Sequence, residues 1–350
     1  MLKNRTLIVL VVVLVVLGVI SLLQSISHDR STSRSHTSSV LTGSFTTDDM
    51  QKITIGYGAD AAVVVLDRRP DGWVVRSGYD HRANPDRVEN LLTNLSDLQG
   101  EFRSDAPDVL VDYGFTDTTT VTITGYTTDG DEPTFAVEIG KRPERSQGNF
   151  IKTPNSSAVY LTTKSILGAV GLYGGPKAPE NKFFYDLDAH RCDRLEVDAI
   201  TMQDGDSIIT LEREVQTPEP AADDTTGIVT EADRNVYEWK ITEPETRMAL
   251  KTRGDGVLGA VSTIRAVDIA DPAVDLATYG LAEPQKRATI RLQDGTERTF
   301  LFGAKREAEG DRQAGYYFQV AGEPTVWIVN EYLLNNLFKS YEDLLPEEEG

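Results

Sequence analysis

The sequence predicts an α+β fold, in which an N-terminal transmembrane helix precedes two similar, mostly antiparallel β-sheet units that each carry one main packed helix. Three observations predict it. A hydrophobic segment lies near the N-terminus, the rest of the chain contains one pattern twice, and each copy combines alternating apolar strands with a single helical stripe. At 350 residues the chain has room for two domains.

The hydrophobic segment covers residues 7–26 and follows a short N-terminus, residues 1–6, that carries Lys3 and Arg5. About 20 apolar residues suffice to cross ~30 Å of hydrocarbon, and positive residues stay on the cytoplasmic side. We therefore expect a single-pass anchor in the cytoplasmic (inner) membrane, with residues 1–6 inside and the body extracytoplasmic or periplasmic. The alternative is a cleaved signal peptide, with Ser25 and Ser27 near the cleavage site, but the length of the segment favours the anchor.

Residues 27–47 are rich in serine and threonine and predict a flexible tether that lifts the body off the membrane. Residues 346–350 form a short acidic tail. Neither stretch has enough apolar residues to form a core of its own.

The chain is strongly acidic, with 55 Asp and Glu against 35 Lys and Arg and a formal net charge of −20. Such a surface repels phosphate backbones, so we expect no nucleic-acid partner. We favour solubility as the reason for the acidity, and an acidic patch that recruits a basic partner is the alternative. The single cysteine, Cys192, allows no intramolecular disulfide.

Two repeat units, residues 48–185 and 190–345, begin with the same elements: an alternating strand, an apolar strand and a strand that contains tryptophan. We expect these strands at residues 51–55, 62–66 and 72–75 in the first unit and at residues 193–197, 207–211 and 238–241 in the second. The distance from the tryptophan to a Tyr-Gly pair is the same in both units, from Trp73 to Tyr113-Gly114 and from Trp239 to Tyr279-Gly280. Chance rarely produces equal spacing over such a length.

Each unit has a helical stripe between these landmarks. The first stripe starts at Pro85 and comprises Val88, Leu91, Leu92, Leu95 and Leu98. The second comprises Val257, Leu258, Val261 and Ile264.

The second half of each unit also repeats. A strand (residues 119–124 or 288–292) leads through an Asp-Gly turn to another strand, which ends at a glycine and a basic pair, Lys141-Arg142 or Lys305-Arg306. Two further strands and a short helix, expected at residues 164–172 and 331–338, close each unit. Residues 213–234 are an acidic insertion in the second unit, rich in Pro, Asp, Glu and Thr, and predict an exposed loop.

The tryptophan strand, the apolar helix, the Tyr279-Gly280-Leu281 segment with Pro284, the hairpin and the glycine-basic turn together resemble the domain of unknown function 4340 family, in two tandem copies. The resemblance spans about residues 50–345 and is clearer in the second copy, because Phe115 replaces the leucine and the proline is missing in the first. It implies an envelope protein linked to ABC-type transport systems of the gliding-motility kind. It supplies no catalytic residues.

The repeated landmarks have structural and functional interpretations. For the Tyr-Gly pairs we favour a helix-to-strand corner, with a left-handed glycine and a tyrosine that packs beneath it, over contact with a ligand. Trp73 and Trp239 are interpreted likewise as core residues. The two basic pairs are interpreted as solvated turn residues, with binding of an anionic group as the alternative.

The sequence offers no catalytic, cofactor-binding or metal-binding set. The four histidines, His28, His36, His81 and His190, lack metal-ligand spacing, and no nucleophile or phosphate-loop motif is present. We therefore expect no cofactor and no enzymatic activity.

Three functional hypotheses follow. The first is a membrane-anchored scaffold or accessory subunit that binds an envelope or inner-membrane protein complex, and the second is a module that binds cell-wall glycan or another polymer. The second requires exposed tryptophan or tyrosine side chains in a line. The third, a hydrolase, would require clustered carboxylates around a pocket.

Overall fold

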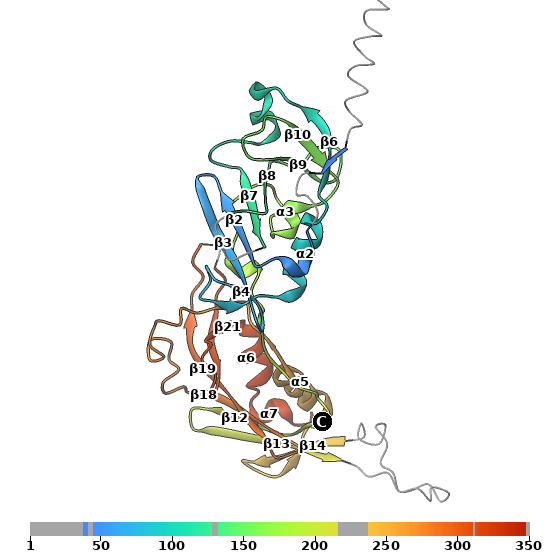
Figure 1. Cartoon of the computed structure of the whole chain (residues 1–350). Coiled ribbons are helices and arrows are strands. Elements are labelled where there is room, and N and C mark those ends of the chain that lie inside the picture. The colour runs from blue at the N-terminus through green and yellow to red at the C-terminus, as the bar shows by residue number, and fades with distance from the viewer. Residues whose placement is uncertain (1–37, 41–44, 128–131, 216–236, 311, 348–350) are drawn as a thin grey trace, which may run out of the picture. The chain divides into compact units, whose positions relative to one another are not determined.

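The structure is a computed structural model that describes residues 38–40, 45–127, 132–215, 237–310 and 312–347 (Figure 1). The predicted anchor, most of the tether, most of the acidic insertion and the last three residues of the tail lie outside this part of the chain. Among the described residues, no helix combines the length and the apolar character needed to cross a bilayer.

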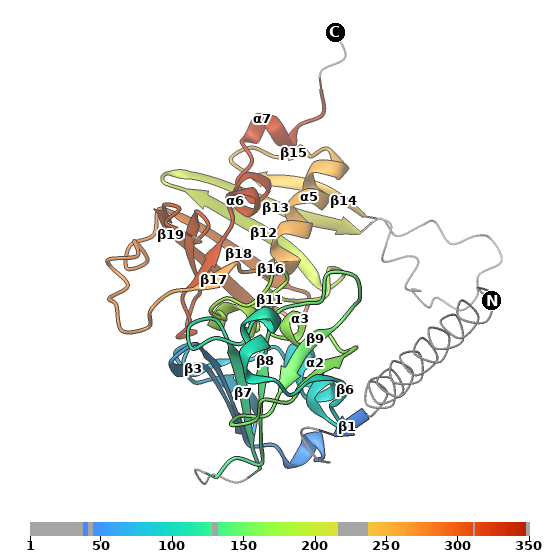
Figure 2. The ribbon, with the colours of Figure 1, turned by 90° about the horizontal axis from the view of Figure 1, so that it is seen from above.

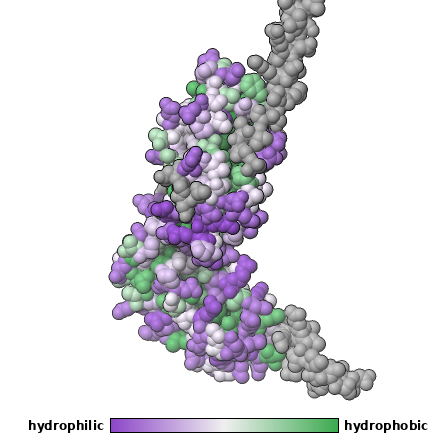
Figure 3. Space-filling model, in the orientation of Figure 1, coloured by the Kyte–Doolittle hydropathy of each residue, from purple (hydrophilic) through white to green (hydrophobic). Residues whose placement is uncertain are grey.

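The described residues form antiparallel sheets with a few helices, which confirms the predicted α+β class. The chain divides into two compact units between Asp186 and Leu187. Hydrophilic residues predominate on the face of each unit that Figure 3 shows, with apolar residues in small groups among them.

The first unit contains a ten-stranded sheet in the order β1-β6-β10-β9-β8-β7-β2-β3-β4-β5. Its strands are β1 (Ser38–Val40), β2 (Lys52–Tyr57), β3 (Asp60–Arg69), β4 (Gly72–Val75), β5 (His81–Arg82), β6 (Gln99–Ser104), β7 (Val121–Tyr126), β8 (Phe135–Ile139), β9 (Asn149–Lys152) and β10 (Val159–Thr162). Its helices are α2 (Pro85–Leu95) and α3 (Ile166–Ala169), with 3-10 turns η1 (Thr47–Asp49), η2 (Pro107–Val109), η3 (Val111–Tyr113) and η4 (Asn181–Phe183). Helices α2 and α3 pack against each other (Figure 2).

The second unit contains a nine-stranded sheet in the order β15-β14-β13-β12-β18-β19-β20-β21-β17 and a separate β11-β16 pair. Its strands are β11 (Asp188–Arg191), β12 (Val197–Asp204), β13 (Ser207–Val215), β14 (Tyr237–Glu243), β15 (Arg247–Met248), β16 (Thr263–Arg265), β17 (Asp268–Ile269), β18 (Lys286–Leu292), β19 (Glu297–Arg306), β20 (Gly315–Val320) and β21 (Trp327–Val329). Its helices are α5 (Lys251–Ser262), α6 (Glu331–Leu337) and α7 (Tyr341–Leu344), and α5 packs against both α6 and α7.

The two sheets share one topology. Read from β5 to β6 and from β15 to β17, nine strands follow in the same spatial order and in the same order along the chain, and the first sheet adds β1 beyond β6. Neighbouring strands are antiparallel throughout both sheets, as between β2 and β7 or β12 and β18. The repeat predicted from equal spacings is therefore a repeat of the fold.

Helix α2 begins at Pro85, as the sequence predicts. Asn84 caps it, because its side-chain oxygen accepts a hydrogen bond from the backbone N–H of Arg87 at 3.1 Å. The predicted apolar stripe, which includes Leu98 beyond the helix end, is buried. In the second unit Val257, Leu258 and Val261 are buried on α5, but Ile264 belongs to β16, so the helix is shorter than its stripe suggested.

The tether prediction was wrong at its C-terminal end. Ser38–Val40 form β1, which pairs antiparallel with β6, and the ring of Phe45 stacks on Phe135 with 5.0 Å between centroids. A serine-rich segment can pair in this way because ladder hydrogen bonds use backbone groups, and β6 would otherwise leave them without partners at the sheet edge.

Two boundaries in the second unit also differ from the prediction. The expected opening strand at residues 193–197 is mostly a turn, because the Asp193 carboxylate accepts from the backbone N–H of Leu195 at 2.9 Å; β12 starts only at Val197. The insertion begins later than residue 213, since β13 continues to Val215 and Arg213 is buried against Trp239.

The closing helix of the first unit is also shorter than predicted. It spans Ile166–Ala169 instead of residues 164–172. Gly171 ends it with a left-handed φ of 80°, at a place where a β-carbon would collide with the ring of Phe183.

Candidate protein-binding groove

The Tyr-Gly landmarks form the same corner in both units. The carbonyl of Tyr113 accepts a hydrogen bond from the N–H of Lys141 at 2.9 Å, and that of Tyr279 accepts from Ala304 at 2.8 Å. Gly114 and Gly280 have left-handed φ angles of 86° and 69°.

A second glycine completes each corner. A β-carbon on Gly140 would collide with the carbonyl oxygen of Tyr113, and one on Gly303 with that of Tyr279. Gly140 directly follows β8 and Gly303 lies in β19, at the point where the tyrosine corner approaches the strand. The close approach therefore requires one glycine in the corner and a second glycine in or beside the strand. Pro284, which follows the second corner, is buried, and its carbonyl accepts from Arg287 Nε at 3.3 Å. Both corners therefore have the left-handed glycine and the close backbone approach that the structural interpretation expects.

The landmark tryptophans do not form an exposed row. Trp239 is fully buried and donates from its indole nitrogen to Asp255 at 3.0 Å, Trp327 is buried, and Trp73 is half-buried. A glycan-binding platform needs exposed rings, so these tryptophans do not supply one.

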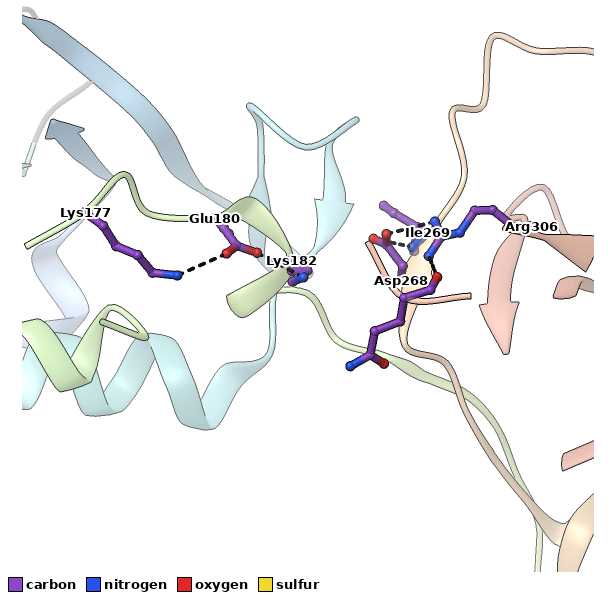
Figure 4. Close-up of polar contacts among 7 residues, drawn as sticks. Lys177, Glu180, Lys182, Asp268, Ile269 and Arg306 are labelled. Atoms are coloured by element: carbon purple, nitrogen blue, oxygen red, sulfur yellow. Dashed lines mark hydrogen bonds and ion pairs between the residues drawn. The ribbon is translucent and has the colours of Figure 1, made fainter. Parts of the chain in front are cut away.

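The basic pair of the second unit differs from its interpretation as solvated turn residues. Lys305 and Arg306 end strand β19, and Arg306 donates to Asp268 at 3.0 Å and to the carbonyl of Gln313 at 3.0 Å. Figure 4 shows Arg306 directed at Asp268. Lys305 lies 3.7 Å from a Glu331 carboxylate oxygen. Both cations are thus engaged by carboxylates of this chain.

The first-unit pair lies in the loop after β8. Arg142 donates to the hydroxyl of Ser165 at 3.5 Å and to the carbonyl of Leu172 at 3.4 Å, whereas the side chain of Lys141 is exposed.

Elsewhere in this unit Glu180 lies between Lys177 and Lys182 (Figure 4). Its carboxylate oxygens are 3.6 Å from the Lys177 ammonium nitrogen and 3.0 Å from that of Lys182. The hydrogen bond from Lys182 is the main reason why the pKa of Glu180 is lowered.

A groove of 410 Å³ lies in the second unit between α5, β16 and α6. No pattern in the sequence predicted this groove. Its lining comprises Gly256, Gly259 and Ala260 on α5, Thr263 and Arg265 on β16, and Asn330, Tyr332, Leu333 and Asn336 in and just before α6.

The small side chains of α5 open this groove. Counted from the landmark tryptophans, Gly256, Gly259 and Ala260 occupy the positions of Asn90, Thr93 and Asn94 in the first unit. In α2 these larger side chains lie on the helix surface, where Asn94 donates to the carbonyl of Asn90 at 2.8 Å. The second unit therefore presents nearly bare helix backbone where the first presents polar side chains.

A lysine also ties the two helical segments of the first unit together. Lys164 donates from Nζ to the carbonyls of Thr93 at 3.2 Å and Ser96 at 2.8 Å, at the C-terminal end of α2. In the second unit, α6 begins with Glu331, whose carboxylate cannot donate to carbonyls. Glu331 instead accepts from the hydroxyl of Tyr316 at 3.4 Å.

The helix glycines need separate explanations. At Gly254 the indole of Trp239 occupies the space of a β-carbon, so a side chain is excluded. At Gly256 a β-carbon would meet nothing within 4 Å, and at Gly259 only Arg194 at 3.5 Å. Glycine in a helix interior costs about 1 kcal/mol relative to alanine, and no contact within the described chain requires it at Gly256 or Gly259.

The rim of the groove carries an exposed aromatic ring. Tyr332 is 73% exposed, the largest value among the large hydrophobic residues that the structure describes as exposed. Tyrosine combines apolar area with a polar hydroxyl and is enriched in protein interfaces. Its position beside the bare stretch of α5 makes this groove the best candidate for contact with another protein.

The charge of the groove differs from that of the whole chain. Arg265 is its single charged lining residue. Outside the groove, groups of three or more His, Cys, Asp or Glu side chains able to hold a metal are also missing from the described residues. The arrangement can thus bind a partner surface, and its residues provide no acid-base pair.

Sequence reasoning identified the buried face of α5 from Val257, Leu258 and Val261 and missed the groove on the opposite face. The available signal was the presence of Gly254, Gly256 and Gly259 within one predicted helix. Glycine weakens a helix interior, and Gly256 and Gly259 lie outside the apolar stripe, where a β-carbon would clash with nothing.

The family described as Domain of unknown function (DUF4340) matches residues 73–226 and 239–347. Both matched segments begin at a landmark tryptophan, Trp73 or Trp239. No curated protein and no solved structure shows detectable similarity to the chain.

Proposed function

This chain belongs to the DUF4340 family, and from that premise we propose that it is a non-enzymatic scaffold or accessory subunit, anchored in the cytoplasmic membrane, that binds an envelope protein complex on the extracytoplasmic side. The hydrophobic segment at residues 7–26 motivates the anchor. An ABC-type membrane complex is the partner that the sequence resemblance suggests.

The groove on α5 is the observation that carries the proposal. Two helix positions, Gly256 and Gly259, keep a residue that weakens the helix although a β-carbon would fit there. A partner that approaches the helix backbone closely would account for both glycines, because a side chain would hold it away. The absence of these features from the first unit indicates that the fold itself does not require them.

A protein segment suits this groove better than a small molecule does. Small-molecule sites enclose most of the ligand and are lined mainly by apolar and aromatic side chains. Here threonine, two asparagines and an arginine share the lining with the glycines, and Tyr332 projects into solvent. An amphipathic helix laid into the groove would meet both kinds of surface.

Glycan binding, the alternative, lacks a comparable observation. It requires rings exposed in a row, and Trp239 and Trp327 are buried. We therefore do not propose it as a second function.

Site-specific photo-crosslinking in native membranes tests the proposal. A benzophenone amino acid replaces Tyr332 in the full chain, and Tyr173 of the first unit, 69% exposed, is the matched control position. We expect a discrete protein adduct from position 332 and none from position 173. Equal adducts at both positions, or none at position 332, would refute the groove as the binding site.

A reporter fused after Gly350 tests the location separately. An alkaline phosphatase fusion should be active and a cytoplasmic reporter inactive, because the positive N-terminus stays inside. The opposite pattern would contradict the anchor orientation.

A further inference from the structure

The groove has a cationic end, which indicates what its occupant carries. Arg265 ends β16, directly beyond the C-terminal end of α5, and its side chain is 64% exposed. None of the other residues that line the groove is charged.

The nearest carboxylate does not neutralise this end. Asp188 lies 3.8 Å from Arg265 Nε and 3.3 Å from Arg191 Nη2, so one carboxylate serves two guanidinium groups. Asp188 also lies directly opposite Arg265 in the β11-β16 pair. The cluster of these three side chains retains one positive charge.

The acidic residue of α6, Glu331, makes its carboxylate contacts with residues other than Arg265. Glu331 accepts from Tyr316 and lies 3.7 Å from Lys305. A positive groove end on a chain of net charge −20 is unusual enough to select a partner by charge.

We propose that the occupant of the groove is an α-helix of the partner protein that presents a carboxylate to Arg265. This inference rests on the proposed function and adds the chemistry of the partner to it. The bare backbone at Gly256 and Gly259 accepts the apolar face of that helix, and the guanidinium fixes its register through a charge-assisted hydrogen bond. Arg265→Lys keeps the positive charge but loses the planar guanidinium group.

The experiment uses the full chain in native membranes with the benzophenone group at position 332. Arg265→Gln removes the charge, Arg265→Lys retains it, and Arg247→Gln is the matched control. Arg247 is an exposed arginine of the same unit, 3.9 Å from Glu245, and it does not line the groove. Circular dichroism verifies that each variant is folded.

We expect Arg265→Gln to reduce the adduct about fivefold, the upper range for one exposed ion pair, and Arg265→Lys and Arg247→Gln to leave it nearly unchanged. Added salt should lower the adduct with Arg265 present and have less effect on Arg265→Gln. Mass spectrometry should locate the adduct on a helix with Asp or Glu near the linked residue.

An adduct of undiminished yield in Arg265→Gln would overturn the charge assignment while leaving the proposed function intact. An adduct on a segment without acidic residues would do the same. No adduct even with Arg265 present would remove the proposed function itself, so the two failures are distinguishable.

Discussion

The guanidinium of Arg213 lies over the indole of Trp239, with 5.5 Å from Cζ to the ring centroid. The same guanidinium donates to the carbonyls of Leu195 at 2.8 Å and Arg194 at 2.6 Å, in the turn that precedes β12. It therefore joins β13, β14 and the turn before β12, and desolvation by this burial lowers its pKa.

The first unit repeats this arrangement. Arg68 lies over Trp73 at 6.0 Å and donates to the carbonyl of Asp48 at 2.8 Å, in the turn η1 that precedes β2. Arg68 and Trp73 are directly opposite each other in the ladder, as are Arg213 and Trp239. Both units therefore contain an arginine-tryptophan contact. It links the segment before β2 or β12 to the strand that contains the tryptophan, β4 or β14.

Replacement of Arg213 should destabilise the second unit strongly. Arg213 is 8% exposed, and Arg213→Met would leave two carbonyls and the Trp239 face without their donor. We expect a loss of about 2–3 kcal/mol in the free energy of unfolding. Denaturant titration measures it, and Arg68→Met, at a more exposed side chain, should cost less. Equal losses would contradict the role of burial.

Two helix glycines should respond to alanine in opposite directions. Gly256→Ala should stabilise the protein by up to about 1 kcal/mol, because its β-carbon meets nothing within 4 Å. Gly254→Ala should destabilise it, because the β-carbon would collide with Trp239. Thermal unfolding compares the two, and a stabilising Gly254→Ala would show that the indole can move aside.

Stability should fall as the pH is lowered through the range of His190. This side chain is buried against Phe300, and desolvation lowers its pKa from 6.5 to about 4. Between these values the unfolded chain binds a proton that the folded chain does not, so stability is retained above pH 6.5 and is lost towards pH 4.

The loss amounts to about 3 kcal/mol for a shift of this size. His190→Gln lacks the titration, so denaturant curves of both proteins from pH 7 to pH 4 isolate it. Parallel pH dependences in the two proteins would contradict the lowered pKa.

The neighbours Lys305 and Arg306 should differ sharply. Arg306 and Asp268 are both mostly buried, and Arg306→Gln would leave the Asp268 carboxylate without its cation. We expect a loss of about 3 kcal/mol. Lys305→Gln, in an exposed pair with Glu331, should change stability by less than about 1 kcal/mol. Urea unfolding of both variants measures the difference, and similar values would restore the interpretation of the pair as solvated.

Much of the fold could be predicted because the signals are local. The apolar stripe of α2 and its start at Pro85 follow from helical periodicity and the geometry of proline. Equal spacing from tryptophan to Tyr-Gly revealed the duplication, since the corner requires a left-handed glycine in each copy. The predicted boundaries failed where a side chain such as Asp193 redirected the backbone.

The sequence by itself determined two antiparallel α+β units, their family and an N-terminal segment suited to a membrane, because periodicity, turn residues and hydrophobic length are properties of neighbouring residues. Only the tertiary structure decided that β1 joins the sheet through β6, that Arg213 meets Trp239 and that a groove opens between α5 and α6. These features depend on which distant segments the sheets bring together. The groove forms because α5 has glycine and alanine where α2 has larger side chains, and its other walls come from β16 and α6.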